Sequence, residues 1–262
     1  MLATTEALAS QRSAARRLKS MFEAYLKYSE SPGECCFFVE YFNKFLRRKI
    51  NLRIFADKIV QFMENVRKMM YVHGFASSGS SGTVMTLRRY FPDWRVVAPD
   101  LPVDPFEALE LLRETVKQEC PEIVIGTSMG GMYTQQLWGV PRIVVNPSFE
   151  MSRTLLFNHM GKHKYTAKRK DGATEFRIDK NIVERFKQME KNQFDGITDD
   201  EKRLVYALFG TKDKIVNFRP LMAQLYGEER CLWFEGEHRL NDTVVKKHII
   251  PLIKELCPDT LW

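Results

Sequence analysis

Long apolar runs and C-x-x-C motifs are both missing from this 262-residue sequence, although 44% of its residues are hydrophobic. No stretch approaches the roughly 20 apolar residues of a membrane-spanning helix, and residues 1–30 lack the apolar core of a secretory signal. The five cysteines are an odd number, which together with their spacing is typical of reduced thiols. We therefore expect a cytoplasmic protein without stable membrane insertion.

Signals for metal, phosphate and nucleic-acid binding are also weak. No cysteine and histidine set has zinc-ligand spacing, and the small-residue run 76–83 (ASSGSSGT) lacks the Gly-Lys-Ser/Thr ending of a P-loop. The net charge is +7, of which residues 1–66 carry +4 from 11 basic and 7 acidic residues. A small excess of positive charge is typical of a solvated face. We expect no metal, no cofactor and no nucleic-acid partner, and we interpret residues 76–83 as a loop and helix cap.

Short strand-like segments alternate with helical ones from about residue 67 onward. Helical spacing is clearest in residues 105–117 and 243–256. Such alternation predicts an α/β fold, in which a doubly wound, mostly parallel sheet has helices on both faces. If the second strand lies outside the first and the third returns to its other side, a ligand crevice forms at that switch point. The strand candidates are 69–72, 95–98, 122–126, 142–146, 204–209 and 231–234.

Residues 122–131 (EIVIGTSMGG) place a serine between glycines directly after a β-branched run. The run predicts a strand buried on both faces, and residues 129–137 can continue as a helix, with Ser128 at the joint. In a nucleophile elbow this turn is so tight that side chains two positions away would collide with the backbone, and Gly126 and Gly130 have none. The pattern predicts Ser128 as a nucleophile; an ordinary Gly/Ser turn is the alternative.

A serine nucleophile needs a base, and the base needs an acid to orient it. The predicted strand 204–209 runs into Gly-Thr-Lys-Asp, which places Asp213 just past its carboxyl end. The predicted strand 231–234 is followed by Glu-Gly-Glu-His, which ends at His238. The chain order serine, aspartate, histidine is known for one α/β fold. We therefore predict Asp213 as the acid and His238 as the base.

Each of these assignments has an alternative. Asp213 could serve only as a turn former, and His238 could cap the helix that follows it. Glu150, after the predicted strand 142–146, is the fallback acid. The remaining histidines fit the role of base less well, because they lie in a polar stretch, in the closing helix or far from the acid; these are His73, His159, His163 and His248.

Residues 69–75 (MMYVHGF) read as a strand followed by a turn. Acyl transfer needs donors for the oxyanion of the tetrahedral intermediate. The backbone N–H groups of Met129, the residue after the nucleophile, and of Phe75 in this turn are the candidates. Gly74 lets the chain bend toward the substrate, and we expect His73 to brace the loop.

Two segments extend beyond this core. An insertion at about residues 150–202 is expected to form a helical cap, with helices at 151–157 and 181–192 and a basic loop between them. The amino-terminal residues 1–66 predict two amphipathic helices, which could cover a sheet edge, form a homodimer or touch a membrane surface; translation could also start near Met63. The basic loop could attract a phosphate-bearing substrate such as an acyl-CoA or be simply solvated; its cations are Lys162, Lys164, Lys168, Arg169 and Lys170.

The sequence resembles the small bacterial YqiA/YcfP-like α/β-hydrolases over residues 69 to about 255. The matching stretches are YVHGFASSGSSGTV, VVAPDLPVDPFEALELL, IVIGTSMGGMYTQQL, VVNPSFEMSRTL, LFGTKDKIVN and EGEHRLND. The resemblance implies an α/β-hydrolase domain at residues 67–262 and a compact esterase or thioesterase with Ser128, Asp213 and His238 as its triad. The helical extension at residues 1–66 departs from this family.

These features together predict a serine hydrolase of carboxylic esters or thioesters that acts through an acyl-enzyme. Its partner would be a small acyl ester or thioester, and the sequence does not identify the substrate-binding residues. A non-catalytic binding protein on a hydrolase scaffold is the main alternative, because the same fold could hold Asp213 or His238 out of reach. A docking module built on residues 1–66 is a further alternative.

Overall fold

The computed structural model describes residues 66–258. Of residues 1–66, only Val66 is described. The two helices predicted within this segment, and any dimer contact through them, therefore lie outside the described residues. Contacts along the chain separate a unit Met1–Val66 from a unit Arg67–Trp262, and the description below concerns the second. Its described cysteines, Cys120, Cys231 and Cys257, are free thiols.

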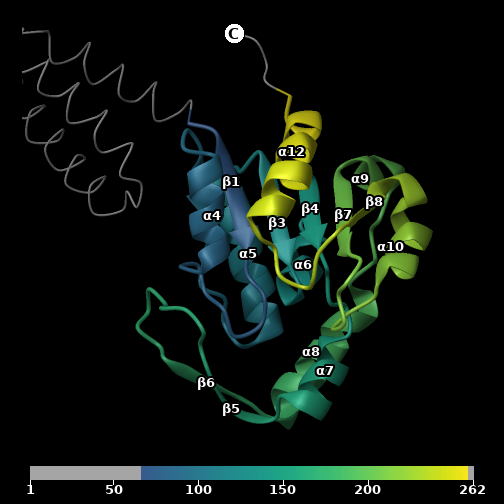
Figure 1. The fold of residues 1–262 in the computed structure, drawn as a ribbon. Coiled ribbons are helices and arrows are strands. Elements are labelled where there is room, and N and C mark those ends of the chain that lie inside the picture. Colours follow the sequence, from purple (N-terminus) through teal and green to yellow (C-terminus); the bar gives the residue numbers. More distant parts are fainter. Residues whose placement is uncertain (1–65, 259–262) are drawn as a thin grey trace, which may run out of the picture. The chain divides into compact units, whose positions relative to one another are not determined.

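Six parallel strands form the central sheet in the order β2-β1-β3-β4-β7-β8 (Figure 1). The second strand lies outside the first and the third returns to its other side, so the predicted switch point is confirmed. The predicted α/β fold with a doubly wound, mostly parallel sheet is confirmed as well. The strands are β1 (Lys68–Val72), β2 (Arg95–Val97), β3 (Ile123–Thr127), β4 (Arg142–Val145), β7 (Val205–Gly210) and β8 (Cys231–Phe234).

Alternate residues of each strand enter two separate hydrophobic cores, one on each face of the sheet. Along β3, for example, Val124 joins one core while Ile123 and Ile125 join the other. Because both faces are covered, the central strands read as continuous apolar runs. The first core is covered by α5 (Pro105–Glu119), α6 (Met129–Thr134) and α10 (Arg219–Tyr226), and the second by α4 (Gly82–Tyr90) and the closing helix.

The closing helix is regular at its ends and wider in its middle. It consists of α11 (Asp242–Val244), a π-helical turn (Val245–Ile249) and α12 (Ile250–Leu256). Pro251 lies two residues after the wide turn ends, and a proline inside a helix removes one backbone donor and displaces the preceding carbonyl groups. Asn241 begins the helix, because its side chain accepts a hydrogen bond from the Val244 N–H.

The insertion after β4 forms a cap at the end of the sheet where the strands terminate (Figure 1). Its helices α7 (Met151–Asn158) and α8 (Lys180–Asn192) lie there, whereas α9 (Asp199–Arg203) lies at the other end of the sheet, where Glu201 pairs with Arg142 at the start of β4. The segment that we expected to be a basic loop is instead largely an antiparallel hairpin of β5 (Gly161–Lys164) and β6 (Glu175–Ile178). In β5 the lysines are exposed and His163 is half-buried. Exposed and half-buried residues therefore alternate as in a strand, but the sequence does not show this alternation clearly because most of the residues are polar.

Other differences from the expected elements are small. Helix α6 ends at Thr134 and continues to Leu137 only as turns. The helix at 105–117 extends to Glu119 and begins at Asp104, whose carboxylate accepts hydrogen bonds from the Phe106 and Glu107 N–H groups. Across residues 66–258, none of the helices has the length and apolarity needed to cross a bilayer.

Candidate active site

Ser128 occupies the strained turn that the sequence predicts between β3 and α6. Its backbone has φ 55° and ψ −124°, a conformation that is unfavourable for a residue with a side chain. A Cβ atom at Gly126 would lie 2.1 Å from Thr134 Oγ1, and one at Gly130 would lie 2.1 Å from the Val72 carbonyl oxygen. Both glycines are therefore required by close approach of the chain, as the elbow pattern predicts.

Backbone hydrogen bonds fix this turn against the neighbouring strand. The Ser128 N–H donates to the Val145 carbonyl over 3.1 Å, and the Ser128 carbonyl accepts from the Ser148 N–H over 3.0 Å. The turn is thus bonded to the end of β4 and to the loop that follows it. This support offsets the unfavourable backbone conformation of Ser128.

Asp213 and His238 meet at the same edge of the sheet. His238 Nδ1 lies 2.7 Å from Asp213 Oδ2, and the two side chains are 16% and 3% exposed. Asp213 Oδ1 also accepts hydrogen bonds from the Ile215 and Val216 N–H groups, so the residue shapes its turn as well as binding the imidazole. The helix after His238 is capped by Asn241, which removes the alternative role for the histidine.

The hydroxyl of Ser128 makes no hydrogen bond within residues 66–258. The structure therefore brings Asp213 and His238 together and places Ser128 in its elbow. A Ser128–His238 hydrogen bond is part of the proposed mechanism. Catalytic hydrogen bonds are often long without substrate and tighten when it binds. The fallback acid Glu150 is exposed and lies 3.7 Å from Arg153.

Asn146 is a buried residue at the centre of the site that the sequence analysis gave no role. Its side-chain oxygen accepts from the Gly210 N–H over 2.7 Å, and its amide donates to the carbonyls of Glu237 and His238 over 3.1 and 3.0 Å. It is 1% exposed and has a left-handed φ of 43°. Asn146 therefore joins the ends of β4 and β7 to the histidine loop. A short amide side chain that tolerates this φ, placed directly after a buried strand, was the available signal.

The loop after β1 passes beside the nucleophile, as the oxyanion prediction requires. A Cβ atom at Gly74 would lie 3.3 Å from Ser128 Cβ, so a side chain at residue 74 would crowd the serine. His73 is 2% exposed and bonds the Gly74 carbonyl through Nδ1 over 2.9 Å, while its Nε2 accepts from the Leu101 N–H over 3.2 Å. The expectation that His73 braces this loop is confirmed.

A narrow cavity lies between this loop and the cap. Its volume is about 30 Å³, more than the roughly 10–15 Å³ that one buried water needs on the same measure. Phe75 and Met129, the two predicted oxyanion donors, both line it. Aliphatic and aromatic side chains make up most of the wall; the lining residues are His73, Phe75, Ala76, Leu101, Pro102, Val103, Met129, Tyr165, Phe176, Ile178 and Phe186.

Aromatic rings of the cap surround Phe75. Its ring centroid lies 4.7 Å from that of His159, 5.5 Å from that of His163 and 5.4 Å from that of Phe176. Burial and the neighbouring His163 lower the pKa of His159 below its usual value. The cap thus packs three rings directly on the residue whose N–H is a candidate oxyanion donor.

The loop between β5 and β6, residues 165–174, joins the cap to the core. Arg169 is buried, donates to Asp171 and to the Leu101 carbonyl, and lies over the Tyr165 ring. The Ser78 hydroxyl donates to the Lys168 carbonyl, and the Lys170 N–H donates to Asp100. Arg169 is therefore a structural contact, and Lys162 is paired with Glu175, which weakens the case for a phosphate site here.

Comparisons with known proteins match one family model and several solved structures. A model of the Uncharacterised protein family (UPF0227) matches residues 68–257. Solved structures similar to this chain include Est1E from Butyrivibrio proteoclasticus, with 15% identity and a TM-score of 0.49 over 74% of this chain and 89% of that one. The methylesterase MES16 from Arabidopsis has 11% identity and a TM-score of 0.49 over 72% and 100%. The thioesterase domain from the curacin biosynthetic pathway has 13% identity and a TM-score of 0.47 over 73% and 91%.

Proposed function

The chain belongs to the uncharacterised protein family UPF0227, and we propose that it is a serine hydrolase of carboxylic esters or thioesters. One observation carries this proposal: the Asp213–His238 pair, joined over 2.7 Å, lies at the sheet edge where Ser128 occupies its strained turn. Three side chains of the types required for acyl transfer therefore come from the ends of three parallel strands.

In the proposed mechanism Ser128 attacks the acyl carbon and transfers its proton to His238. Asp213 binds Nδ1 of the imidazole, which orients the ring and stabilises the imidazolium. The N–H groups of Met129 and Phe75 donate to the oxyanion. His238 then protonates the leaving alcohol or thiol, and water hydrolyses the acyl-enzyme with the same histidine as base.

The proposal also covers the domain organisation, the location, the substrate and the assembly of the protein. Residues 1–66 would form a helical extension, and residues 67–262 the hydrolase domain with its cap at about 150–202. The protein would act in the cytoplasm on a small acyl ester or thioester, acyl-CoA included. The amino-terminal helices would supply a homodimer contact.

A second candidate function is favoured by one observation. Because the Ser128 hydroxyl makes no hydrogen bond within the described residues, the chain could bind acyl compounds without cleaving them. A fluorophosphonate probe distinguishes the two candidates, since it reacts only with an activated serine. A hydrolase is labelled at Ser128, whereas a binding protein is not labelled under conditions in which it is folded.

The labelling experiment uses the full chain and two variants. We expect Ser128→Ala to abolish labelling and Ser80→Ala, which changes an exposed serine, to leave it intact. Hydrolysis of p-nitrophenyl acetate or butyrate should give a burst of one nitrophenolate per chain if deacylation is slow. Absence of labelling in the folded wild-type protein would contradict the proposal.

A further inference from the structure

The end of helix α7 carries a cluster of exposed apolar side chains. Leu156, Phe157 and Met160 are 46%, 73% and 41% exposed, and Phe157 is the most exposed large hydrophobic residue between residues 66 and 258. Single exposed apolar residues are common on proteins, whereas a group of neighbours marks an interaction site. The other exposed large hydrophobic residues of the described part lie far apart in the sequence; these are Met85, Phe106, Ile215 and Trp233.

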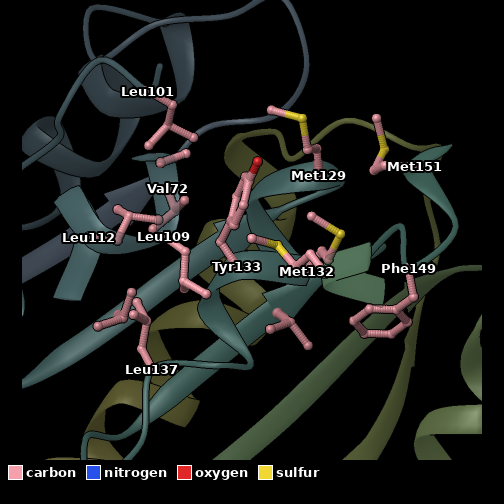
Figure 2. Packing of buried hydrophobic residues seen from close by; sticks show 14 of the residues in the cluster. Val72, Leu101, Leu109, Leu112, Met129, Met132, Tyr133, Leu137, Phe149 and Met151 are labelled. Atoms are coloured by element: carbon pink, nitrogen blue, oxygen red, sulfur yellow. The ribbon is translucent and has the colours of Figure 1, made fainter. Parts of the chain in front are cut away.

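Packing against the core does not account for this cluster. Phe149 and Met151, at the beginning of the cap, belong to the first hydrophobic core (Figure 2), and Leu155 is fully buried in it. The buried face of α7 is therefore already supplied by Met151 and Leu155. The opposite face of such a helix is ordinarily polar, but here it carries Leu156 and Phe157.

Positively charged side chains lie on the hairpin that follows directly. In the pairing of β5 with β6, Lys162 lies opposite Arg177 and Lys164 lies opposite Glu175. Directly opposite residues of an antiparallel pair share one face, and so do residues two positions apart along a strand. All four side chains are exposed, so they form the outer face of the hairpin. Figure 1 shows the end of α7 and the start of β5 at the side of the cap that faces away from the central sheet.

The inner face of the same hairpin packs on the candidate active site. His163 and Phe176 lie opposite each other, and both rings contact the ring of Phe75. Phe176 and Phe75 also line the cavity. Anything bound to the outer face is therefore separated from this cavity by the thickness of one hairpin.

The outer face carries a net positive charge. Lys162 pairs with Glu175 over 3.0 Å, and Lys164 acts on the same carboxylate at longer range. Arg177 forms no ion pair within the part of the chain that the structure describes. Residues 150–180 as a whole contain 8 basic and 4 acidic residues, a net charge of +4, whereas the rest of residues 67–262 sums to −1. The positive charge of this unit is thus concentrated in the cap.

We propose that this part of the cap docks on a membrane surface that contains anionic phospholipids. The apolar side chains enter the boundary between headgroups and acyl chains, and the cations attract the anionic headgroups. The aliphatic stems of lysine and arginine extend the apolar contact while their charged ends stay in water. The cap docking surface consists of Leu156, Phe157, Met160, Lys162, Lys164 and Arg177.

Charge complementarity favours a lipid surface over a second copy of the chain. In a two-fold contact through this surface, Lys164 and Arg177 would lie close to the same residues of the other copy. Like charges brought together in this way oppose association. An anionic membrane has the opposite charge and accepts the apolar side chains without a matching pocket.

Sedimentation of the full chain with lipid vesicles tests the proposal. We expect the wild-type protein to bind vesicles of phosphatidylcholine mixed with phosphatidylglycerol more tightly than vesicles of phosphatidylcholine alone, and to bind less as salt is added. Phe157→Gln should lower the partition coefficient for the mixed vesicles about fivefold to tenfold, because an apolar contact is lost. The double variant Lys164→Gln, Arg177→Gln should lower it about 10- to 30-fold.

Two matched variants control for the chemical change alone. Met85→Gln replaces an exposed apolar residue of α4, and the double variant Arg113→Gln, Lys117→Gln removes the same charge from the exposed side of α5. Each should change the partition coefficient less than twofold. All the variants should keep the wild-type thermal midpoint, because the side chains that they change are exposed.

Three results would each overturn the inference. The first is that the wild-type protein fails to bind the mixed vesicles. The second is that binding is unchanged by both sets of cap substitutions, which would place the membrane contact elsewhere in the chain. The third is that binding depends on Lys164 and Arg177 but not on Phe157, which would indicate attraction to any polyanion, acidic proteins included. Labelling of Ser128 by the fluorophosphonate is independent of all three, so the hydrolase proposal stands or fails separately.

Discussion

At the sheet edge the candidate catalytic residues are held by backbone hydrogen bonds and one buried amide, whereas side-chain contacts hold the cap in place. Ser128 is bonded through its own backbone to β4 and the loop after it, and Asn146 bonds the backbones of Gly210 and His238. The cap has one backbone hydrogen bond to the loop after β1, from the Thr166 N–H to the Ala76 carbonyl, and otherwise relies on contacts that involve side chains, such as those of Arg169 and of the rings packed around Phe75. The difference indicates that the sheet sets the geometry of the proposed reaction and the cap sets the shape of the acyl site.

The largest expected effect tests the sheet edge. Ser128→Ala should lower kcat by a factor on the order of 10³ or more, because the nucleophile is lost. Asp213→Asn should lower kcat about 10⁴-fold, because the imidazole would be held in the wrong tautomer. Steady-state hydrolysis of p-nitrophenyl butyrate measures both, with Ser80→Ala as the unchanged control.

Asn146→Ala should lower kcat about 10- to 100-fold, because the histidine loop loses its connection to β7 and small displacements of a catalytic group are costly. Asn146→Asp retains the acceptor for the Gly210 N–H but places a carboxylate oxygen against the Glu237 and His238 carbonyls, so it should lower kcat at least as much as Asn146→Ala. Asn181→Ala, an exposed change in α8, is the control. A rise in KM with unchanged kcat would argue against a positioning role for Asn146.

A smaller effect is expected in the cap. Arg169→Gln removes a buried guanidinium that binds Asp171 and the Leu101 carbonyl, so it should loosen the loop at residues 165–174. We expect KM to rise about threefold to tenfold with little change in kcat, since uniform binding is lost. Lys162→Gln breaks an exposed ion pair with Glu175 and should change KM less than twofold. A fall in kcat without a change in KM would indicate that Arg169 positions the candidate catalytic residues at the sheet edge.

The smallest effect concerns pH and stability. Burial lowers the pKa of His73 below its usual value of 6.5, so the folded chain binds fewer protons than the unfolded chain. The stability contributed by neutral His73 is present above pH 6.5 and is lost as the pH falls toward the lowered pKa. The thermal midpoint should therefore decrease between pH 7.5 and 5, and less steeply in His73→Gln than in the wild-type protein. Parallel slopes in the variant and the wild type would show that His73 does not contribute.

Much of the site could be predicted because its signals are local. Apolar strands ending in Gly-Thr-Lys-Asp or Glu-Gly-Glu-His locate Asp213 and His238 at strand ends, and parallel strands end at one edge. Asn146 was missed because its role depends on groups 64 and 91 residues away. The β5–β6 hairpin was missed because its polar residues mask the alternation, and Arg169 was read as part of a solvated or phosphate-binding loop because its buried partners come from the core.

The sequence by itself determined the doubly wound sheet, the glycine-flanked turn at Ser128 and the order in which the candidate residues follow their strands. These features depend on side-chain period and backbone freedom, which short segments specify. The tertiary structure alone decided that Asn146 joins the ends of β4 and β7 to the histidine loop, that Arg169 binds the cap to the core and that the Tyr133 hydroxyl is buried without a partner among residues 66–258. Such roles depend on which distant groups become buried together, and hydrogen-bond satisfaction in a folded interior is not encoded by any single segment.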